Sequence, residues 1–198
     1  MGSGRGRATR EALLDAAAAA IADEGWHGAT ARSIAGRADV PLGTVNYHFR
    51  GKDELLRVAV VRELHRMFAT PQRIMSEARS LDELLSGMIG WACGADTTTR
   101  QHVLLFEAMA QARRDPLLGE LLGEALVAFR RSLEKELAGL VSKADPSPPL
   151  PAVGAAFAAQ CDGLFLHFLI EPGFPLGLAN EQASAAWRDY LLAGRSSP

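Results

Sequence analysis

The spacing of apolar residues along the 198-residue chain predicts an all-helical protein. Apolar positions recur three and four residues apart, whereas the strict alternation that marks a strand hardly occurs. Alanine and leucine, both good helix formers, are abundant. We expect nine helices, near residues 9–24, 30–38, 41–48, 52–70, 81–94, 101–113, 116–141, 152–170 and 180–193.

Glycine, threonine and proline residues predict where these helices begin and end. Gly25 is expected to terminate the first helix, and Thr30 is a good N-cap for the second. Pro71 is expected to separate the fourth helix from the fifth, because proline interrupts a helix. Pro116 suits the start of the seventh helix, and the proline-rich segment 145–151 predicts a stiff loop before the eighth.

The segment from residue 30 to residue 56 holds two short helices joined by a tight turn. Such a pair buries little core by itself, and its usual purpose is to hold one exposed helix at an angle that suits the DNA major groove. Val45 and Phe49 are four residues apart, so they share one helix face and are expected to pack against Ile34 and Ile21. Burial of that face turns the opposite face outward, and the pattern therefore predicts operator binding.

The outward face carries residues that suit contacts with DNA. Gly43 lets the backbone approach the duplex closely. Thr44, Tyr47 and His48 offer hydroxyl and imidazole donors to phosphate oxygens. Taken singly, each of these residues is more often an ordinary surface residue, so the hypothesis depends on the spaced set.

Basic residues strengthen the hypothesis. Arg32, early in the second helix, has a fork that suits guanine. Lys52 begins the fourth helix, where its side chain and the helix N-terminus can together hold one phosphate. Arg5, Arg7 and Arg10 lie in a segment without acidic residues, which is expected to be a flexible basic arm that attracts DNA of any sequence.

The composition is that of a soluble globular protein, with 48% hydrophobic and 22% charged residues. The net charge of −2 argues against indiscriminate binding of nucleic acid, but residues 1–70 carry ten basic and eight acidic residues. Cys93 and Cys161 lie far apart and are expected to be reduced thiols. No signal peptide is visible, and polar residues interrupt the apolar stretch 152–170, so we expect a cytoplasmic protein.

Residues 9–56 resemble the DNA-binding domain of the TetR family of one-component transcriptional regulators. The resemblance rests on Ile34, Ala35, Ala38, Val40, Gly43, Thr44, Val45, Tyr47, His48, Phe49, Lys52 and Leu55. The rest of the chain matches the family only in its pattern of helices. The resemblance implies a nine-helix TetR-like fold, in which residues 1–52 form a helix-turn-helix domain and residues 53–198 form a domain that binds ligand and dimerises.

Four positions depart from the family pattern. Asp39 stands where the family places glycine, so we expect a left-handed and somewhat strained backbone there. Pro41 replaces the commoner serine and removes a side-chain cap. Asn46 replaces tyrosine and can read adenine, while Leu42 replaces a polar residue and can touch a thymine methyl group. The departures at Asp39, Pro41 and Asn46 favour a competing hypothesis, a ligand-binding or scaffold helical protein without specific DNA binding.

The two C-terminal helices carry more apolar surface than one buried face requires. Val153, Phe157, Leu164 and Phe168 lie on one side of the eighth helix, with small residues interleaved that let helices approach closely. The resemblance implies that helices 8 and 9 pair with those of a second copy in a four-helix homodimer interface. Burial within one monomer is the alternative.

By the same resemblance, an effector cavity lies among the helices of the second half. Aromatic and methionine side chains with a few polar groups suit an apolar small molecule, although at helical spacing they are more often plain core. The candidate ligand-binding residues are Trp91, His102, Phe106, Met109, Phe129, Asp162 and Phe165.

We therefore expect a ligand-responsive transcriptional regulator, most simply a repressor, that binds a palindromic operator as a homodimer and is released by a small apolar effector. No cofactor, metal site or membrane partner is expected. An enzyme is disfavoured because the sequence holds no GxSxG, HExxH or Walker motif. Its only Glu-x-x-His pattern, Glu24 to His27, straddles an expected helix end and does not suit a di-iron bundle.

Overall fold

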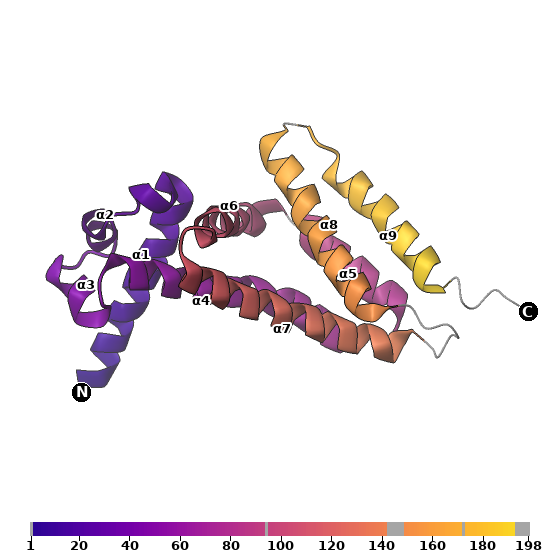
Figure 1. Ribbon diagram of the computed structural model, residues 1–198, viewed down its shortest axis with the longest axis horizontal. Helices are drawn as coiled ribbons and strands as arrows, with labels where there is room; N and C mark the ends of the chain where they lie inside the picture. Colours follow the sequence, from indigo (N-terminus) through magenta and orange to yellow (C-terminus); the bar gives the residue numbers. More distant parts are fainter. Residues whose placement is uncertain (1, 94, 142–148, 172, 193–198) are drawn as a thin grey trace, which may run out of the picture. The chain divides into compact units, whose positions relative to one another are not determined.

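The computed structural model describes residues 2–93, 95–141, 149–171 and 173–192, and every regular element within those ranges is an α-helix (Figure 1). This confirms the predicted all-α, nine-helix architecture. The helices are α1 (Gly2–Gly28), α2 (Ala31–Arg37), α3 (Gly43–His48), α4 (Lys52–Glu77), α5 (Leu81–Cys93), α6 (Ala95–Ala112), α7 (Pro116–Leu140), α8 (Leu150–Ile170) and α9 (Leu176–Leu192).

The helices pack into two compact units. The first unit comprises residues 1–66 and 100–125, and it holds α1 to α3, the first part of α4, most of α6 and the first part of α7. The second comprises residues 67–99 and 126–198, with the remainder of α4 and α7 together with α5, α8 and α9. These units are defined by contacts between helices and not by function. The functional domain boundary expected between residues 52 and 53 therefore stays a prediction.

The first unit has a core built from the apolar faces of its N-terminal helices. Helices of seven and six residues, such as α2 and α3, are not stable alone and depend on this core for their position. The spacing predicted from the sequence is confirmed, because the residues expected on the inward faces are buried. They include Leu13, Ala17, Ile21, Ile34, Ala35, Val45, Phe49, Leu55, Leu56, Ala59 and Val60.

The second unit has a separate core. The rings of Phe68 and Phe129 stack with their centroids 4.2 Å apart. The indole Nε1–H of Trp187 in α9 donates to Oε1 of Gln160 in α8 over 2.7 Å. A void lined by side chains of α5, α7, α8 and α9 has a volume of only about 10 Å³. This volume is at the lower limit for one water molecule. This region is therefore closely packed.

Pro71 does not end a helix, so the predicted break between the fourth and fifth helices there is wrong. The residue is buried inside α4, which continues to Glu77. A proline removes one backbone donor, here the partner of the Met67 carbonyl. Met67, Phe68 and Met75 are buried on both sides of it, and this burial outweighs the lost hydrogen bond. The connection to α5 instead lies at residues 78–80.

Several other helix boundaries differ from the prediction. The third helix begins at Gly43 rather than at residue 41, and the sixth begins at Ala95 rather than at residue 101. The eighth begins at Leu150, so the expected loop ends sooner, because proline is compatible with the first turn of a helix. Residues 145–148 of that loop lie outside the described residues, as does the side chain of Cys93. Cys161 is a free, partly buried thiol.

The N-terminal segment is helical from Gly2 onward, which corrects the prediction of a flexible arm. The Thr9 hydroxyl donates to the carbonyl oxygen of Arg5 over 3.0 Å and supports this first part of α1. Gly25 is expected from the sequence to end the first helix. Its φ of 74° and ψ of 169° lie outside the helical region and kink the chain, but α1 continues beyond it to Gly28.

Candidate nucleic-acid interface

Helix α2 is fixed at its start by a capping box. The Thr30 hydroxyl oxygen accepts from the Ser33 N–H over 3.1 Å, and the Ser33 hydroxyl accepts from the Thr30 N–H over 3.2 Å. Two donors at the helix start are thereby satisfied. The predicted N-cap is confirmed, and burial of Ile34 and Ala35 sets which face of α2 looks outward. Arg32 lies on the exposed face.

The turn between α2 and α3 has the left-handed residue predicted for it. Asp39 has a φ of 53°, and among the described residues it is the one non-glycine residue with positive φ. Its N–H donates to the Gly36 carbonyl over 3.2 Å, and the Val40 N–H donates to the Ala35 carbonyl over 3.0 Å. Aspartate tolerates this conformation better than most residues, but it is less favourable than glycine. This turn sets the direction in which α3 leaves α2.

Helix α3 presents one face to the core and the other to solvent. Val45 is 1% exposed and Phe49 is 3% exposed, whereas Tyr47 is 83% exposed. The predicted orientation of this helix is therefore confirmed. Leu42 is 48% exposed, and Gly43 and Asn46 are also exposed.

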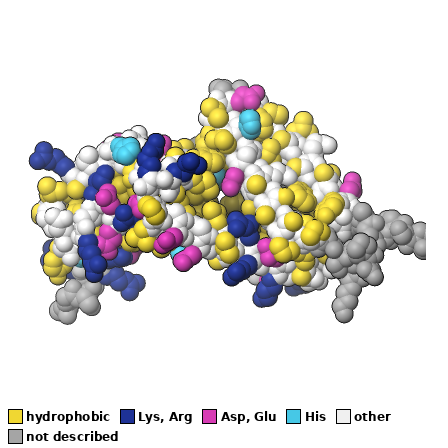
Figure 2. Space-filling view, viewed as in Figure 1, with side chains coloured by type: hydrophobic (Ala, Val, Ile, Leu, Met, Phe, Trp, Pro, Cys, Tyr) yellow, Lys and Arg dark blue, Asp and Glu magenta, His cyan; other side chains and the backbone are white. Residues whose placement is uncertain are grey.

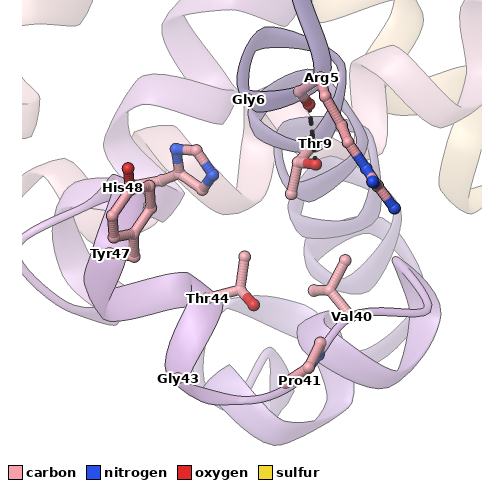
Figure 3. A pocket seen from close by; sticks show the side chains of 9 residues that line it. All are labelled: Arg5, Gly6, Thr9, Val40, Pro41, Gly43, Thr44, Tyr47 and His48. Atoms are coloured by element: carbon pink, nitrogen blue, oxygen red, sulfur yellow. Dashed lines mark hydrogen bonds between the residues drawn. The ribbon is translucent and has the colours of Figure 1, made fainter. Parts of the chain in front are cut away.

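A groove opens between the first turns of α1 and the outward face of α3. It has a volume of about 790 Å³ and is lined by Arg5, Gly6, Thr9, Val40, Pro41, Gly43, Thr44, Tyr47 and His48. The rings of Tyr47 and His48 lie on the α3 side, with Arg5 and Thr9 on the α1 side (Figure 3). Hydroxyl, imidazole and guanidinium groups around one open groove can donate to the phosphates of a nucleic-acid strand.

The aromatic side chains at the end of α3 contact one another. The rings of Tyr47 and His48 are 4.9 Å apart and meet edge to face, so His48 is partly covered while Tyr47 projects into solvent. Lys52 is also partly exposed, at the first position of α4. The Glu54 carboxylate accepts from the Arg50 N–H over 2.6 Å just before α4. This hydrogen bond fixes the backbone that leads into α4.

Several cations near this groove, on α2 and at the start of α4 have no acidic partner among the described residues. Arg37, Arg57, Arg62 and Arg66 each form ion pairs with aspartate or glutamate. Within the part of the chain that the structure describes, the side chains of Arg5, Arg7, Arg32, Arg50 and Lys52 form no such pair. Figure 2 shows Lys and Arg side chains at the surface over α1 to α3, interspersed with acidic ones. These side chains therefore supply positive charge near the groove that no described carboxylate compensates, although the net charge of the protein is negative.

Sequence reasoning found most of this surface but missed part of it. The groove brings together Gly43, Thr44, Tyr47 and His48, which were predicted, whereas Arg32, Leu42, Asn46 and Lys52 do not line it. Thr9 and Gly6 were missed, since a segment expected to be a flexible arm has no defined neighbours. Arg50 was also missed, although it lies between His48 and Lys52 in the sequence. If the first helix had been predicted to begin at Gly2, its helical periodicity would have indicated which face Thr9 lies on.

The predicted effector residues are divided between the two units. His102, Phe106 and Met109 of α6 lie in the first, and Trp91, Phe129, Asp162 and Phe165 lie in the second. His102 is buried at 6% exposure. The Phe129 ring stacks on Phe68, and the Phe165 ring meets Phe168 edge to face at 5.6 Å. These two aromatic residues pack in the core, and a contact with ligand stays a prediction for all seven.

Asp162 is chemically unusual among them. Burial raises the pKa of this carboxyl to about 6. Among the residues that the structure describes, no cation or hydrogen-bond donor offsets that burial. A carboxylate kept from water without a partner destabilises the protein unless something else neutralises it.

Comparison with known proteins agrees with this geometry. A model of bacterial regulatory proteins of the tetR family matches residues 13–59, and one of the BetI-type transcriptional repressor C-terminal domain matches residues 81–193. The chain belongs to the TetR family. Among its relatives, the HTH-type transcriptional regulator BetI of Escherichia coli (strain K12) is 30% identical over 187 residues, which cover 84% of this chain and 85% of that protein.

Two further transcriptional regulators are similar over most of their length. The HTH-type nicotine-responsive transcriptional repressor HdnoR of Paenarthrobacter nicotinovorans is 23% identical over 167 residues, covering 84% of this chain and 86% of that protein. A transcriptional regulator from Saccharomonospora viridis, solved in complex with choline, has the same fold, with a TM-score of 0.76 at 16% identity and coverage of 91% and 95%. The present protein is accordingly a ligand-responsive transcriptional regulator of the helix-turn-helix class.

Proposed function

We propose that this TetR-family regulator binds a palindromic operator as a homodimer in the cytoplasm, and that it represses transcription until a small organic cation releases it from DNA. The observation that carries the proposal is the division of α3 into a buried face and a polar exposed face. Val45 and Phe49 anchor the helix, and Tyr47 is left 83% exposed beside the groove.

The DNA-binding surface comprises α3, the start of α1 and the exposed side of α2. Tyr47, His48 and Thr44 suit phosphate oxygens, and the unpaired arginines supply attraction that is independent of sequence. Leu42, Asn46 and Arg32 are exposed and are proposed to contact base edges, where an amide suits adenine and a guanidinium suits guanine.

Homodimerisation is supported by apolar surface on α8 and α9. Leu166 and Ile170 of α8 are 43% and 69% exposed, and Leu178 and Tyr190 of α9 are 60% and 50% exposed. Figure 2 shows hydrophobic side chains over the part of the surface where α8 and α9 lie. Contiguous exposed apolar surface of this kind marks an interaction site, and a second copy of the same helix pair would cover it.

Helix α8 is long and apolar enough to cross a membrane by length and composition, and 22% of its most apolar stretch is buried in one copy. A dimer interface accounts for the same surface. The half-buried Asp162 within α8 is costly in a lipid environment, and Trp187 of α9 is hydrogen-bonded to its Gln160. Both features favour a protein partner over lipid.

The effector is proposed to be a small organic cation with an apolar body. Asp162 has no cationic partner among the described residues, and Phe165 is its neighbour one helical turn away. A carboxylate beside aromatic side chains suits a charged amine or quaternary ammonium group. Choline and nicotine are named for two of the similar proteins; choline carries a quaternary ammonium group and nicotine an amine that accepts a proton.

Release from DNA follows from two-state coupling. The effector favours an arrangement in which the two α3 helices of the dimer no longer match major grooves about 34 Å apart. Thermodynamic reciprocity then requires operator DNA to weaken effector binding by the same factor.

The decisive experiment measures binding of the purified protein to DNA fragments enriched from a genomic library, at several salt concentrations. Wild-type protein is expected to lose affinity steeply with salt, as phosphate contacts require. Thr44→Ala/Tyr47→Ala should abolish enrichment. Lys135→Ala is the matched control, since Lys135 is 84% exposed on α7 in the second unit. Binding that is unaffected by the double substitution would instead favour a ligand-binding protein without specific DNA recognition.

A further inference from the structure

Arg10 differs from the other arginines near the start of α1, because its guanidinium lies over an aromatic ring. Its Cζ is 5.0 Å from the ring centroid of Phe49, within the range of a cation–π contact. Phe49 is 3% exposed, and the Arg10 side chain is 41% exposed. The charge of Arg10 is therefore engaged with the protein core, although its position in the sequence suggests a contact with DNA.

The ring beneath Arg10 belongs to the residue that ends α3. Phe49 is the C-cap, and its N–H donates to the Val45 carbonyl over 2.9 Å. At the other end, Leu42 supplies no side-chain cap. A helix of six residues depends on tertiary contacts for its orientation. A cation near its C-terminus also interacts favourably with the negative end of the helix dipole.

Acidic residues of α1 hold this part of the helix against α4. Glu11 Oε1 lies 3.9 Å from Arg10 Nη1, and Glu11 Oε2 accepts from Arg62 Nη1 of α4 over 2.9 Å. The other terminal nitrogen of Arg62 donates to Asp15 over 2.6 Å. Glu11 and Asp15, one turn apart on α1, are thus both bound to one guanidinium of α4, and Glu11 also lies beside Arg10.

From Phe49 the ring contacts continue to the surface that faces the groove. The His48 ring is 6.5 Å from that of Phe49 and 4.9 Å from that of Tyr47. A change in the Phe49 ring would therefore move His48 and, through it, the exposed Tyr47. Arg10 contacts the buried end of this series of aromatic residues.

We propose that Arg10 is a positioning residue for DNA recognition. It packs on the Phe49 ring and so orients Tyr47 and His48, without itself contacting phosphate. The proposal rests on the proposed function, in which this face of α3 binds the operator. Arg5 is the matched residue for comparison, because it lies on the same helix and lines the groove.

The first test compares operator affinity of the full-length protein at several salt concentrations. Arg10→Ala is expected to weaken operator binding roughly three- to tenfold, which is the range of a partly exposed cation–π contact. The slope of log Kobs against log salt concentration should not change. Arg5→Ala is expected to reduce the magnitude of that slope by about 1.8, since the dimer loses one phosphate contact from each of its two copies. Arg10→Lys, which keeps the charge but not the planar group, should bind with intermediate affinity.

The second test asks whether Arg10 acts through the ring. Phe49→Leu keeps an apolar side chain and removes the aromatic face, and in that background Arg10→Ala should cause no further loss of operator affinity. If Phe49→Leu does not fold, as judged by circular dichroism, the salt slopes of Arg10→Ala and Arg10→Lys decide.

Three results would overturn the role of Arg10: a shallower salt slope for Arg10→Ala, an equal loss of affinity in the Phe49→Leu background, or no loss at all. Failure of the proposed function has a different signature, because wild-type protein would then bind no fragment, or would bind without dependence on salt. That result would overturn both proposals together.

Discussion

The Nε of Arg57 donates to Oδ2 of Asp115 over 2.7 Å, which joins α4 to the residue that caps α7. The other carboxylate oxygen, Oδ1, accepts from the Leu118 N–H over 3.1 Å. One buried side chain therefore satisfies both an arginine and a helix N-terminus. Since α4 follows α3 in the chain, this pair fixes the first part of α4 within the first unit.

Asp115→Asn is expected to destabilise the protein by roughly 1–3 kcal/mol, because asparagine can still cap α7 but cannot form the largely buried ion pair with Arg57. Burial alone raises the pKa of Asp115, but hydrogen bonds from Arg57 and the Leu118 backbone outweigh it and hold the pKa below 3.8. The stabilisation is thus present at neutral pH and is lost as pH falls through this lowered pKa. Thermal melts should show the difference between wild type and variant shrinking below about pH 4; a constant difference would exclude the charged pair as its cause.

Asp162→Asn, unlike Asp115→Asn, is expected to stabilise the folded protein at high pH. Burial raises the pKa of Asp162 to about 6, so the folded protein binds more protons than the unfolded chain between pH 3.8 and 6. Wild-type stability should therefore fall as pH rises through that window. The variant should lack this fall and be more stable than wild type at pH 8 by roughly 1–3 kcal/mol. Denaturant titrations at pH 4 and pH 8 check this, and equal pH profiles for the two proteins would contradict it.

The same substitution tests the nature of the effector. Choline and its neutral isostere 3,3-dimethylbutan-1-ol have nearly the same shape, so a carboxylate in the site should favour choline in wild type and lose that preference in Asp162→Asn. Calorimetric titration of both compounds into both proteins gives the comparison. Equal affinity of wild type for the two compounds would contradict a role for charge in binding.

Asp39→Gly and Asp39→Ala should separate backbone strain from side-chain chemistry. At a φ of 53°, glycine has no steric penalty and alanine has more than aspartate, so stability should decrease in the order Gly, Asp, Ala. The alanine variant is expected to lose about 1 kcal/mol. Urea denaturation provides the measurement. An alanine variant as stable as wild type would show that the left-handed turn is not maintained in solution.

Ile170→Glu tests the homodimer. Ile170 is 69% exposed in one copy, so a charge there should leave the monomer folded but should oppose association by placing a carboxylate in an apolar interface. Sedimentation should show the wild type at twice the 21.2 kDa chain mass and the variant at the chain mass. Ala128→Glu, at an exposed site on α7, is the control. If Ile170→Glu and Ala128→Glu are both dimeric, the interface does not include Ile170.

Predictions from the sequence agreed with the structure where the residues that determine a feature lie within about one helical turn of each other. The face of α3 follows from the four-residue spacing of Val45 and Phe49, and the start of α2 follows from Thr30 and Ser33. Pro71 shows the limit of this reasoning. Its local preference indicated a helix end, but burial around it keeps α4 continuous.

The candidate site was predicted only in part, for the same reason. Tyr47 and His48 were found because their neighbours in sequence place them on an outward face. The groove also needs Arg5 and Thr9, which approach α3 only when α1 packs on the other helices. Asp162 was identified as a buried polar residue, but its lack of a partner became visible only after folding.

The sequence by itself determined the helical class, the helix-turn-helix segment and the polar face of α3, because periodicity and capping depend on residues close together in the chain. Only the tertiary structure decided which cations remain free. Arg57 finds Asp115 58 residues away, and Arg10 lies over Phe49, whereas Arg5 lines the groove without an acidic partner among the described residues. Charge pairing depends on distance in space, and that distance is set by the packing of the helices.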